Sequence, residues 1–207
     1  VAGVGLDDAL RGVGVVVDAS GPAGSGAGMS RSFFGTVTRN LLDAEKRVGV
    51  GHHVALSIVG AAEVNAGYYA GKRVQEDLVT ASDVGWTILR ATQFHEFAPM
   101  LARTATAGPF VLVPKMRCQP IAAAEVGAAL AELAVGGPRG ILPDLAGPKV
   151  ESMADMVRRY VRKTGSGQRV AELVIPGRWW RALRDGSLLP GAGAGAELGT
   201  QTFEEWL

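Results

Sequence analysis

Short apolar runs alternate with segments of helical periodicity along the first half of the chain. The apolar runs end at turn-forming residues, which is typical of buried strands, and they cover residues 13–20, 52–60 and 86–92. Between and after them, apolar residues recur at helical spacing over residues 30–48, 68–81 and 93–104. Because strands buried on both faces read as continuous apolar runs, this pattern predicts parallel strands covered by helices.

The second half of the chain continues the alternation with shorter elements. Extended pieces are predicted at residues 109–114, 119–124, 140–147 and 171–176, and helices at residues 125–135, 152–165 and 177–185. We therefore expect an α/β fold with a Rossmann-type parallel sheet flanked by helices. Such a fold does not by itself determine the function.

Composition and charge exclude several classes of function. The chain has 207 residues, with 21 Lys and Arg against 20 Asp and Glu and a net charge of +1, so no nucleic-acid partner is expected. No apolar run approaches the roughly 18 residues of a membrane span, and no signal peptide is visible, so we expect a cytoplasmic protein that does not bind membranes. The single cysteine and the three histidines lack metal-ligand spacing, so neither a disulfide nor a metal site is expected.

Residues 15–31 have the layout of a strand, a glycine loop and the start of a helix. Asp18 ends the strand, and glycines follow at positions 21, 24, 26 and 28. This layout is typical of a loop that holds dinucleotide phosphates. Such a loop is usually followed, about 20 residues on, by an acidic residue at the tip of the next strand. Here the next strand ends in "LSIVG", and Glu63 lies beyond it. The pattern therefore favours a different loop of the same kind of fold.

Three residues form a pattern suited to proton transfer. Tyr68 and Lys72 are four residues apart, which places both on one face of the predicted helix, and Ser57 stands near the end of the preceding strand. A lysine ammonium one turn from a tyrosine favours the phenolate and lowers the tyrosine pKa from about 10. The lysine can also donate to a ribose hydroxyl, and the serine hydroxyl can hold a substrate carbonyl or hydroxyl in line. The pattern therefore suits hydride transfer to or from a nicotinamide cofactor.

Several segments of the sequence resemble one known family. "DDALRGVGVVVDASGP", "FFGTVTRNLLDAEKRVGVGHHVALSIVG", "GYYAGKRVQEDLV" and "WTILRATQFHEF" are similar to the atypical short-chain dehydrogenase/reductase superfamily, in its NmrA-like, NAD(P)-binding branch. The resemblance covers most of residues 7–160. It implies that Tyr68 is the acid/base, that Lys72 is its partner and a ribose ligand, and that Ser57 lies beside the substrate.

The resemblance also implies a set of binding residues. Those along the adenosine and ribose of the cofactor would be Asp18, Ala19, Ser20 and Gly21. Those near the nicotinamide would be Arg90, Ala91, Thr92 and Gln93. The substrate pocket would be lined by Phe94 and His95.

The function implied by the resemblance is NAD(P)-dependent oxidoreduction of a small carbonyl or alcohol, with NADP or NAD as the cofactor. A sugar-nucleotide epimerase-like reaction uses the same tyrosine and lysine, and a non-catalytic NmrA-like regulator would sense dinucleotide through a partner surface. The resemblance implies a partial NAD(P)-binding domain over residues 1–145 and a small C-terminal, substrate-side region over residues 146–207. The partner expected is a small-molecule substrate, and the oligomeric state stays open.

The sequence departs from the family at its start. Family members begin with a strand, a Gly-x-x-Gly-x-x-Gly loop, a helix and a second strand, whereas this chain begins at "VAGVGLDDAL". By the resemblance, "DASGPAGSGAG" is the loop after the family's fourth strand. We therefore expect an N-terminally truncated Rossmann sheet with weak or absent dinucleotide binding, and an inactive fragment is a further alternative.

Overall fold

The computed structural model describes residues 3–24, 26–190 and 195–207. The chain forms two compact units. Unit 1 comprises Val1–Arg90 and Gly127–Pro143, and unit 2 comprises Ala91–Val126 and Asp144–Leu207. Each unit has its own cluster of buried apolar residues.

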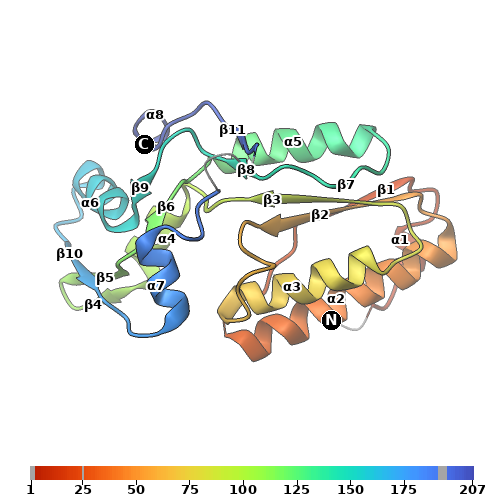
Figure 1. Ribbon diagram of the computed structural model, residues 1–207, viewed down its shortest axis with the longest axis horizontal. Coiled ribbons are helices and arrows are strands. Elements are labelled where there is room, and N and C mark those ends of the chain that lie inside the picture. Colours follow the sequence, from red (N-terminus) through yellow and green to blue (C-terminus); the bar gives the residue numbers. More distant parts are fainter. Residues whose placement is uncertain (1–2, 25, 191–194) are drawn as a thin grey trace. The chain divides into compact units, whose positions relative to one another are not determined.

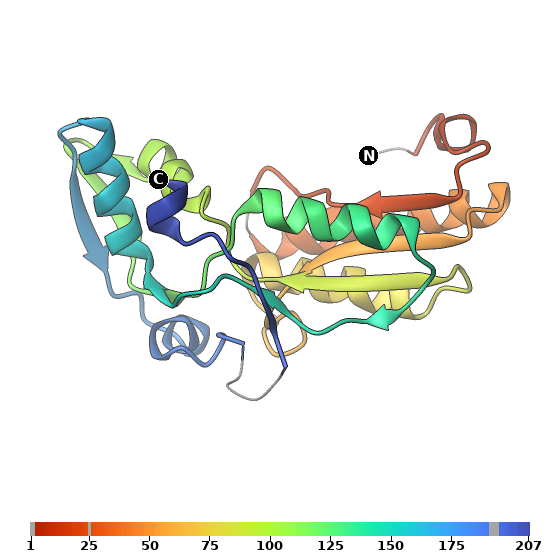
Figure 2. The ribbon, with the colours of Figure 1, turned by 90° about the horizontal axis from the view of Figure 1, so that it is seen from above.

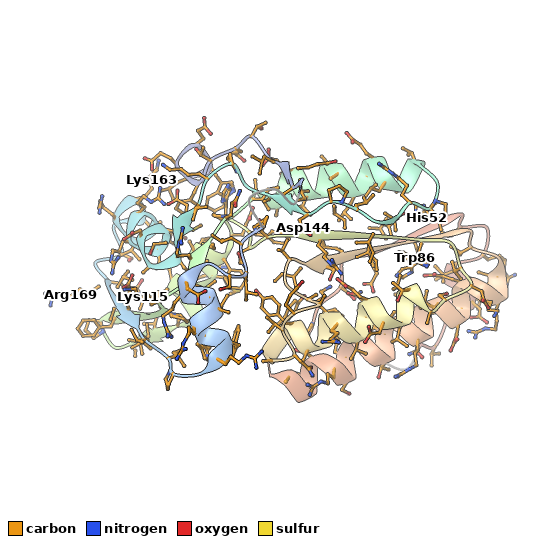
Figure 3. All side chains as sticks on the ribbon, viewed as in Figure 1. His52, Trp86, Lys115, Asp144, Lys163 and Arg169 are labelled. Atoms are coloured by element: carbon orange, nitrogen blue, oxygen red, sulfur yellow. The ribbon has the colours of Figure 1, made fainter. Side chains whose placement is uncertain are left out.

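Unit 1 is built on parallel strands. β1 (Val15–Asp18) pairs with β2 (His52–Ile58), which neighbours β3 (Trp86–Ala91), and β3 pairs in turn with β7 (Gly140–Ile141). Because consecutive parallel strands are joined by helices, their carboxyl ends meet at one edge of the sheet. His52 and Trp86 mark the opposite, amino-terminal ends of β2 and β3 (Figure 3).

Helices cover both faces of the unit 1 strands (Figure 1; Figure 2). α2 (Ala27–Val48) and α3 (Gly67–Thr80) lie against one face, and α5 (Ala123–Val135) lies against the other. A short helix, α1 (Leu6–Ala9), precedes β1. The apolar positions of α2 and α3 face the strands, where a buried cluster contains Leu42, Ala55, Val79 and Ile88.

α3 packs closely on α2 at Gly71. A Cβ at this position would lie 2.6 Å from the Phe34 ring and 2.6 Å from the Ser30 carbonyl group. Because real Cβ atoms essentially never come so close to other heavy atoms, the two helices can hold this separation only around a residue without a side chain.

Unit 2 contains a three-stranded sheet. β10 (Arg169–Leu173) runs parallel to β5 (Phe110–Pro114), and β4 (Thr106–Ala107) pairs antiparallel with β5. α4 (Phe97–Thr104) and α6 (Met153–Thr164) pack on this sheet around a buried cluster. The members of that cluster include Val111, Val113, Met153, Met156, Val157 and Phe203.

Short elements complete unit 2. Two strand pairs are formed by β6 (Arg117–Cys118) with β9 (Glu151–Ser152), antiparallel, and by β8 (Leu145–Ala146) with β11 (Glu197–Leu198), parallel. Two further helices are α7 (Arg178–Asp185) and α8 (Phe203–Trp206). Among the described residues, none of the helices has the length and apolar character needed to cross a membrane.

The predicted α/β class with a parallel, helix-flanked sheet is confirmed. The helix expected over residues 93–104 begins only at Phe97, because the backbones of Gln93 and His95 bond to Ile121 instead. The strand expected within residues 140–147 is two short strands on either side of Pro143, which has no N–H for continuous pairing.

One edge of the unit 1 sheet is formed by β1, whose strand partner in the described part of the chain is β2. Val17 on this strand is 42% exposed. The expectation that the family's first strand, glycine loop and second strand are missing stays a prediction.

The close contact at Gly71 generates a test of the α2–α3 packing. We expect Gly71→Ala to lower the free energy of unfolding by about 1–3 kcal/mol, because the new methyl group forces the helices apart. Gly127→Ala is the matched control, since Gly127 lies exposed in α5 and a Cβ there would meet no neighbouring element within 4 Å. That change should be neutral or stabilising by up to about 1 kcal/mol through helix propensity. Urea denaturation measures both, and equal effects would contradict the packing argument.

Candidate functional site at the strand ends of unit 1

Polar side chains converge at the carboxyl ends of β1, β2 and β3. Asp18 is the last residue of β1, and Ser57 and Arg90 are the next-to-last residues of β2 and β3. From α3, Lys72 and Glu76 face the same edge, one helical turn apart. The carboxyl edge of a parallel sheet is where ligands bind in open α/β folds.

Asp18 shapes the loop that follows β1. Its Oδ1 accepts hydrogen bonds from the Ser20 backbone N–H (3.0 Å) and the Ser20 hydroxyl (2.6 Å), and its Oδ2 accepts one from Gln75 Nε2 (2.8 Å). The residue is buried, with 3% exposure. Both carboxylate oxygens are therefore engaged within the protein, and Asp18 fixes the turn through Ala19, Ser20 and Gly21.

Lys72 is also engaged within the protein. Its Nζ donates to the Leu56 carbonyl (2.6 Å) and to Gln75 Oε1 (2.9 Å), and it lies 4.3 Å from the centroid of the Phe34 ring. Burial lowers the pKa of Lys72 to about 8, while the charges of Asp18 and Glu76 act in the opposite direction. Lys72 thus ties α3 to the end of β2.

Tyr68 lies one turn before Lys72 and faces the β1 loop. A Cβ built on Gly21 would lie 3.3 Å from the Tyr68 hydroxyl, so the loop backbone passes close to the phenol. The Tyr68 ring meets Phe34 edge to face, with centroids 5.4 Å apart.

The environment of Tyr68 keeps its hydroxyl protonated. Burial, followed by the negative charge of Asp18, raises the pKa of Tyr68 to about 12. This direction is opposite to the expected lowering by Lys72. The physical reason is that the Lys72 ammonium points to a backbone carbonyl and to Gln75, 5.8 Å from the centroid of the phenol ring.

A second buried network joins Ser57 to Arg90 through Glu76. The Ser57 hydroxyl donates to Glu76 Oε1 (2.5 Å), which also accepts from Arg90 Nε (2.9 Å). Arg90 Nη2 donates to Glu76 Oε2 (2.6 Å), which completes a two-pronged ion pair. Arg90 therefore forms an ion pair with a carboxylate of its own unit, and the Ser57 hydroxyl is fixed by its bond to Glu76.

Sequence reasoning missed Gln75 and Glu76. Both are buried and follow Lys72 at three- and four-residue spacing, so helical periodicity already places them on the face of Lys72. The segment "KRVQE" already contains this signal, because Gln75 and Glu76 fall on the same helix face as Lys72, the face that the strands cover.

The remaining predicted site residues belong to unit 2. Ala91 pairs with Leu145, and the Thr92 hydroxyl donates to the Gln119 carbonyl (2.6 Å). The carbonyl of Gln93 accepts from the Ile121 N–H (2.9 Å), and Phe94 forms an isolated bridge with Ile121. These residues connect segments within unit 2 through backbone pairing and through the Thr92 hydroxyl.

His95 is fully buried within unit 2. Its Nε2 lies 3.0 Å from the Gln201 carbonyl oxygen, and its ring contacts Phe203 and Trp206. The structure thus places His95 beneath the C-terminal segment, where it joins the packing of α8. A pocket-lining role for Phe94 and His95 stays a prediction.

The start of α2 fits a negatively charged group. Its N-cap, Gly26, provides no side-chain cap, and the first turn carries no acidic residue. The first backbone N–H groups of a helix are left without partners inside the helix, and the helix dipole favours an anion there. Together with the close approach of Gly21 to Tyr68, these features suit a phosphorylated, ribose-containing cofactor along the β1 loop.

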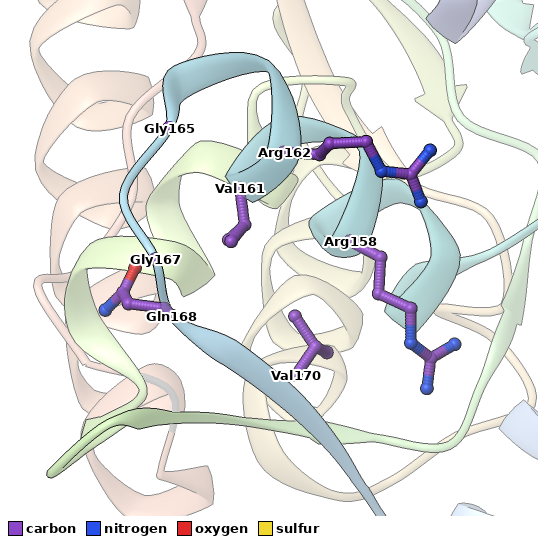
Figure 4. A pocket seen from close by; sticks show the side chains of 7 residues that line it. All are labelled: Arg158, Val161, Arg162, Gly165, Gly167, Gln168 and Val170. Atoms are coloured by element: carbon purple, nitrogen blue, oxygen red, sulfur yellow. The ribbon is translucent and has the colours of Figure 1, made fainter.

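An open cavity of about 450 Å³ in unit 2 is separate from these residues. It lies at the turn between α6 and β10 and is lined by Arg158, Val161, Arg162, Gly165, Gly167, Gln168 and Val170 (Figure 4). None of the predicted site residues lines it. Among the described residues, no group of three potential metal ligands comes together.

The burial of Lys72 generates a prediction about stability and pH. Its pKa is lower in the folded than in the unfolded chain, so between about pH 8 and 10.5 the unfolded chain binds the extra proton. The free energy of unfolding of the natural chain should therefore rise with pH relative to Lys72→Met, by about 1 kcal/mol per pH unit at most. Urea titrations between pH 7 and 10 measure this difference, and parallel curves for the two proteins would contradict it.

Comparison with known proteins places this geometry in context. None of the curated proteins compared with the chain matches it. The solved structures that resemble it include an NADPH-dependent quinone oxidoreductase from Escherichia coli, at 17% identity and a TM-score of 0.65 over 99% of this chain and 78% of that one. A second is a nucleoside-diphosphate-sugar epimerase from Staphylococcus aureus, at 13% identity and a TM-score of 0.68 over 99% and 79%. A third is the Citrobacter triphenylmethane reductase complexed with NADP(H), at 16% identity and a TM-score of 0.61 over 93% and 66%.

These likenesses show a shared fold. The sequence comparison goes further, because residues 4–134 match the family described as NAD(P)H-binding. The matched range contains every strand end and α3 side chain described above, and it extends over more than half of the chain. The chain therefore belongs to the NAD(P)H-binding family.

Proposed function

We propose that the chain is the cofactor-binding part of an NAD(P)H-dependent oxidoreductase of the atypical short-chain dehydrogenase/reductase type, acting on a small carbonyl or alcohol. The observation that carries this proposal is the Tyr68 hydroxyl, which stays protonated and lies against the β1 loop at the carboxyl edge of the sheet. The family match supports the cofactor, and the similar fold of several reductases supports the reaction class.

In this proposal Tyr68 acts as the proton donor in carbonyl reduction. When bound, NAD(P)H supplies the hydride that reduces the carbonyl carbon. The Tyr68 O–H bond breaks as its proton passes to the carbonyl oxygen, which gives the alcohol, and the phenolate then takes a proton from water. Because the pKa of Tyr68 is about 12, the hydroxyl carries this proton at neutral pH. Alcohol oxidation would need the phenolate, which is rare at neutral pH.

Lys72 and Asp18 have supporting roles in this proposal. Lys72 holds the Leu56 carbonyl and Asp18 holds the β1 loop, so each fixes backbone beside Tyr68. The Lys72 ammonium has three N–H donors and makes two internal bonds, so the implied ribose contact does not require it to give up either bond.

A non-catalytic, dinucleotide-sensing regulator is the second candidate. The observation that favours it is the internal hydrogen bonding of both Asp18 carboxylate oxygens and of two Lys72 N–H donors, which suits a structural role. The choice of NADP or NAD, a cytoplasmic location and the NmrA-like branch stay predictions.

Turnover and binding together distinguish these candidates. NADPH oxidation followed at 340 nm with quinone and aldehyde substrates should show activity that falls about 100-fold in Tyr68→Phe, because the proton donor is lost. NADPH affinity should stay within about twofold. Tyr160→Phe, the same change on α6 of unit 2, is the control and should leave both unchanged. Bound NADPH or NADH without turnover in the natural chain would favour the regulator, and binding of neither would favour an inactive fragment.

The protonation of Tyr68 is testable on its own. Phenolate absorbance near 295 nm, compared between the natural chain and Tyr68→Phe, isolates this residue from the other two tyrosines. We expect no phenolate from Tyr68 at pH 10.5, where an ordinary tyrosine with a pKa of about 10 is mostly ionised. A difference signal with its midpoint at or below pH 10 would contradict the raised pKa of Tyr68.

A further inference from the structure

The bond between Ser57 and Glu76 has a defined direction. Glu76 Oε1 and Oε2 each accept an N–H from Arg90, at 2.9 and 2.6 Å, so the carboxylate is ionised and carries no proton of its own. The third bond to this carboxylate, 2.5 Å long, is therefore donated by the Ser57 hydroxyl. Both side chains are buried, so water does not compete for this bond.

This direction limits what Ser57 can offer to a ligand. A serine hydroxyl has one O–H donor and two acceptor lone pairs. Because its donor is committed to Glu76, Ser57 has only lone pairs left for a ligand. It cannot donate to a substrate carbonyl oxygen, which was one of the two roles expected from the sequence.

We propose that Glu76 is a positioning residue that sets the hydrogen-bond polarity of Ser57, and that Ser57 accepts an uncharged N–H from the nicotinamide carboxamide. The proposal rests on the proposed function, in which the cofactor lies over these strand ends. Tyr68 then supplies the donor for the substrate carbonyl, and Ser57 supplies an acceptor for the cofactor. The carboxamide is assigned because it is the uncharged N–H donor nearest to the carbon that transfers hydride.

The polarity is tested first, without any ligand. A serine hydroxyl proton held by a buried carboxylate exchanges slowly with water and resonates downfield in the NMR spectrum of the full chain. Ser57→Ala assigns the signal by removing it. The signal should persist in Asp77→Asn and shift upfield or broaden in Glu76→Gln. Asp77 is the matched control because it is the next residue of α3, has the same charge and is exposed. A Ser57 hydroxyl in fast exchange in the natural chain would overturn the proposal.

The ligand contact is tested second, by titration calorimetry with NADP⁺ and with its 3-acetylpyridine analogue. The analogue replaces the carboxamide NH₂ by a methyl group and keeps the carbonyl oxygen. We expect the natural chain and Asp77→Asn to bind NADP⁺ about five- to tenfold more tightly than the analogue, as one hydrogen bond requires. Ser57→Ala keeps the Glu76–Arg90 pair and should remove this preference.

The possible results separate the two proposals. Equal affinities in the natural chain, or an unchanged preference in Ser57→Ala, would overturn the carboxamide contact while leaving the oxidoreductase proposal standing. If neither NADP⁺ nor NAD⁺ binds the natural chain, the proposed function fails and the carboxamide contact fails with it. The role of Glu76 in setting the hydrogen-bond polarity of Ser57 is then tested by the NMR result alone.

Discussion

The polar face of α3 is the constraint on which the candidate site depends. Lys72, Gln75 and Glu76 are all buried, and a buried polar group without a partner costs about 1–3 kcal/mol, more when it is charged. Their partners are found at the ends of the strands: Leu56 and Ser57 on β2, Asp18 on β1 and Arg90 on β3. One helix face therefore fixes three strand ends relative to one another.

This arrangement explains why the residues of the predicted catalytic pattern differ in how tightly they are held. Lys72 holds the Leu56 carbonyl and Asp18 holds the β1 loop. Both side chains therefore influence the site mainly through their charges. Tyr68 lies at the margin of the network and is half-buried, and its pKa is raised by this burial and by the charge of Asp18. A protonated phenol beside a glycine loop is the consequence, and it suits the proton-donating role proposed for Tyr68.

Much of the fold could be predicted from the sequence because apolar periodicity reports directly on burial. The strands predicted over residues 52–60 and 86–92 are found at 52–58 and 86–91. The helices predicted over residues 30–48 and 68–81 are found at 27–48 and 67–80. The position of the site at the strand ends also follows. The directions of hydrogen bonds do not, because they depend on which buried acceptor each donor reaches. Lys72 illustrates this limit: helical spacing places it beside Tyr68, but its ammonium turns to the Leu56 carbonyl.

We propose that the cofactor lies over the strand ends fixed by α3. The most direct test adds NADPH to the ¹⁵N-labelled 207-residue chain and maps the shifted backbone amide signals. The account predicts the largest shifts at residues 18–21, at Ser57 and at Tyr68. Shifts confined to residues 158–170, around the cavity between α6 and β10, would place the cofactor elsewhere and contradict the account.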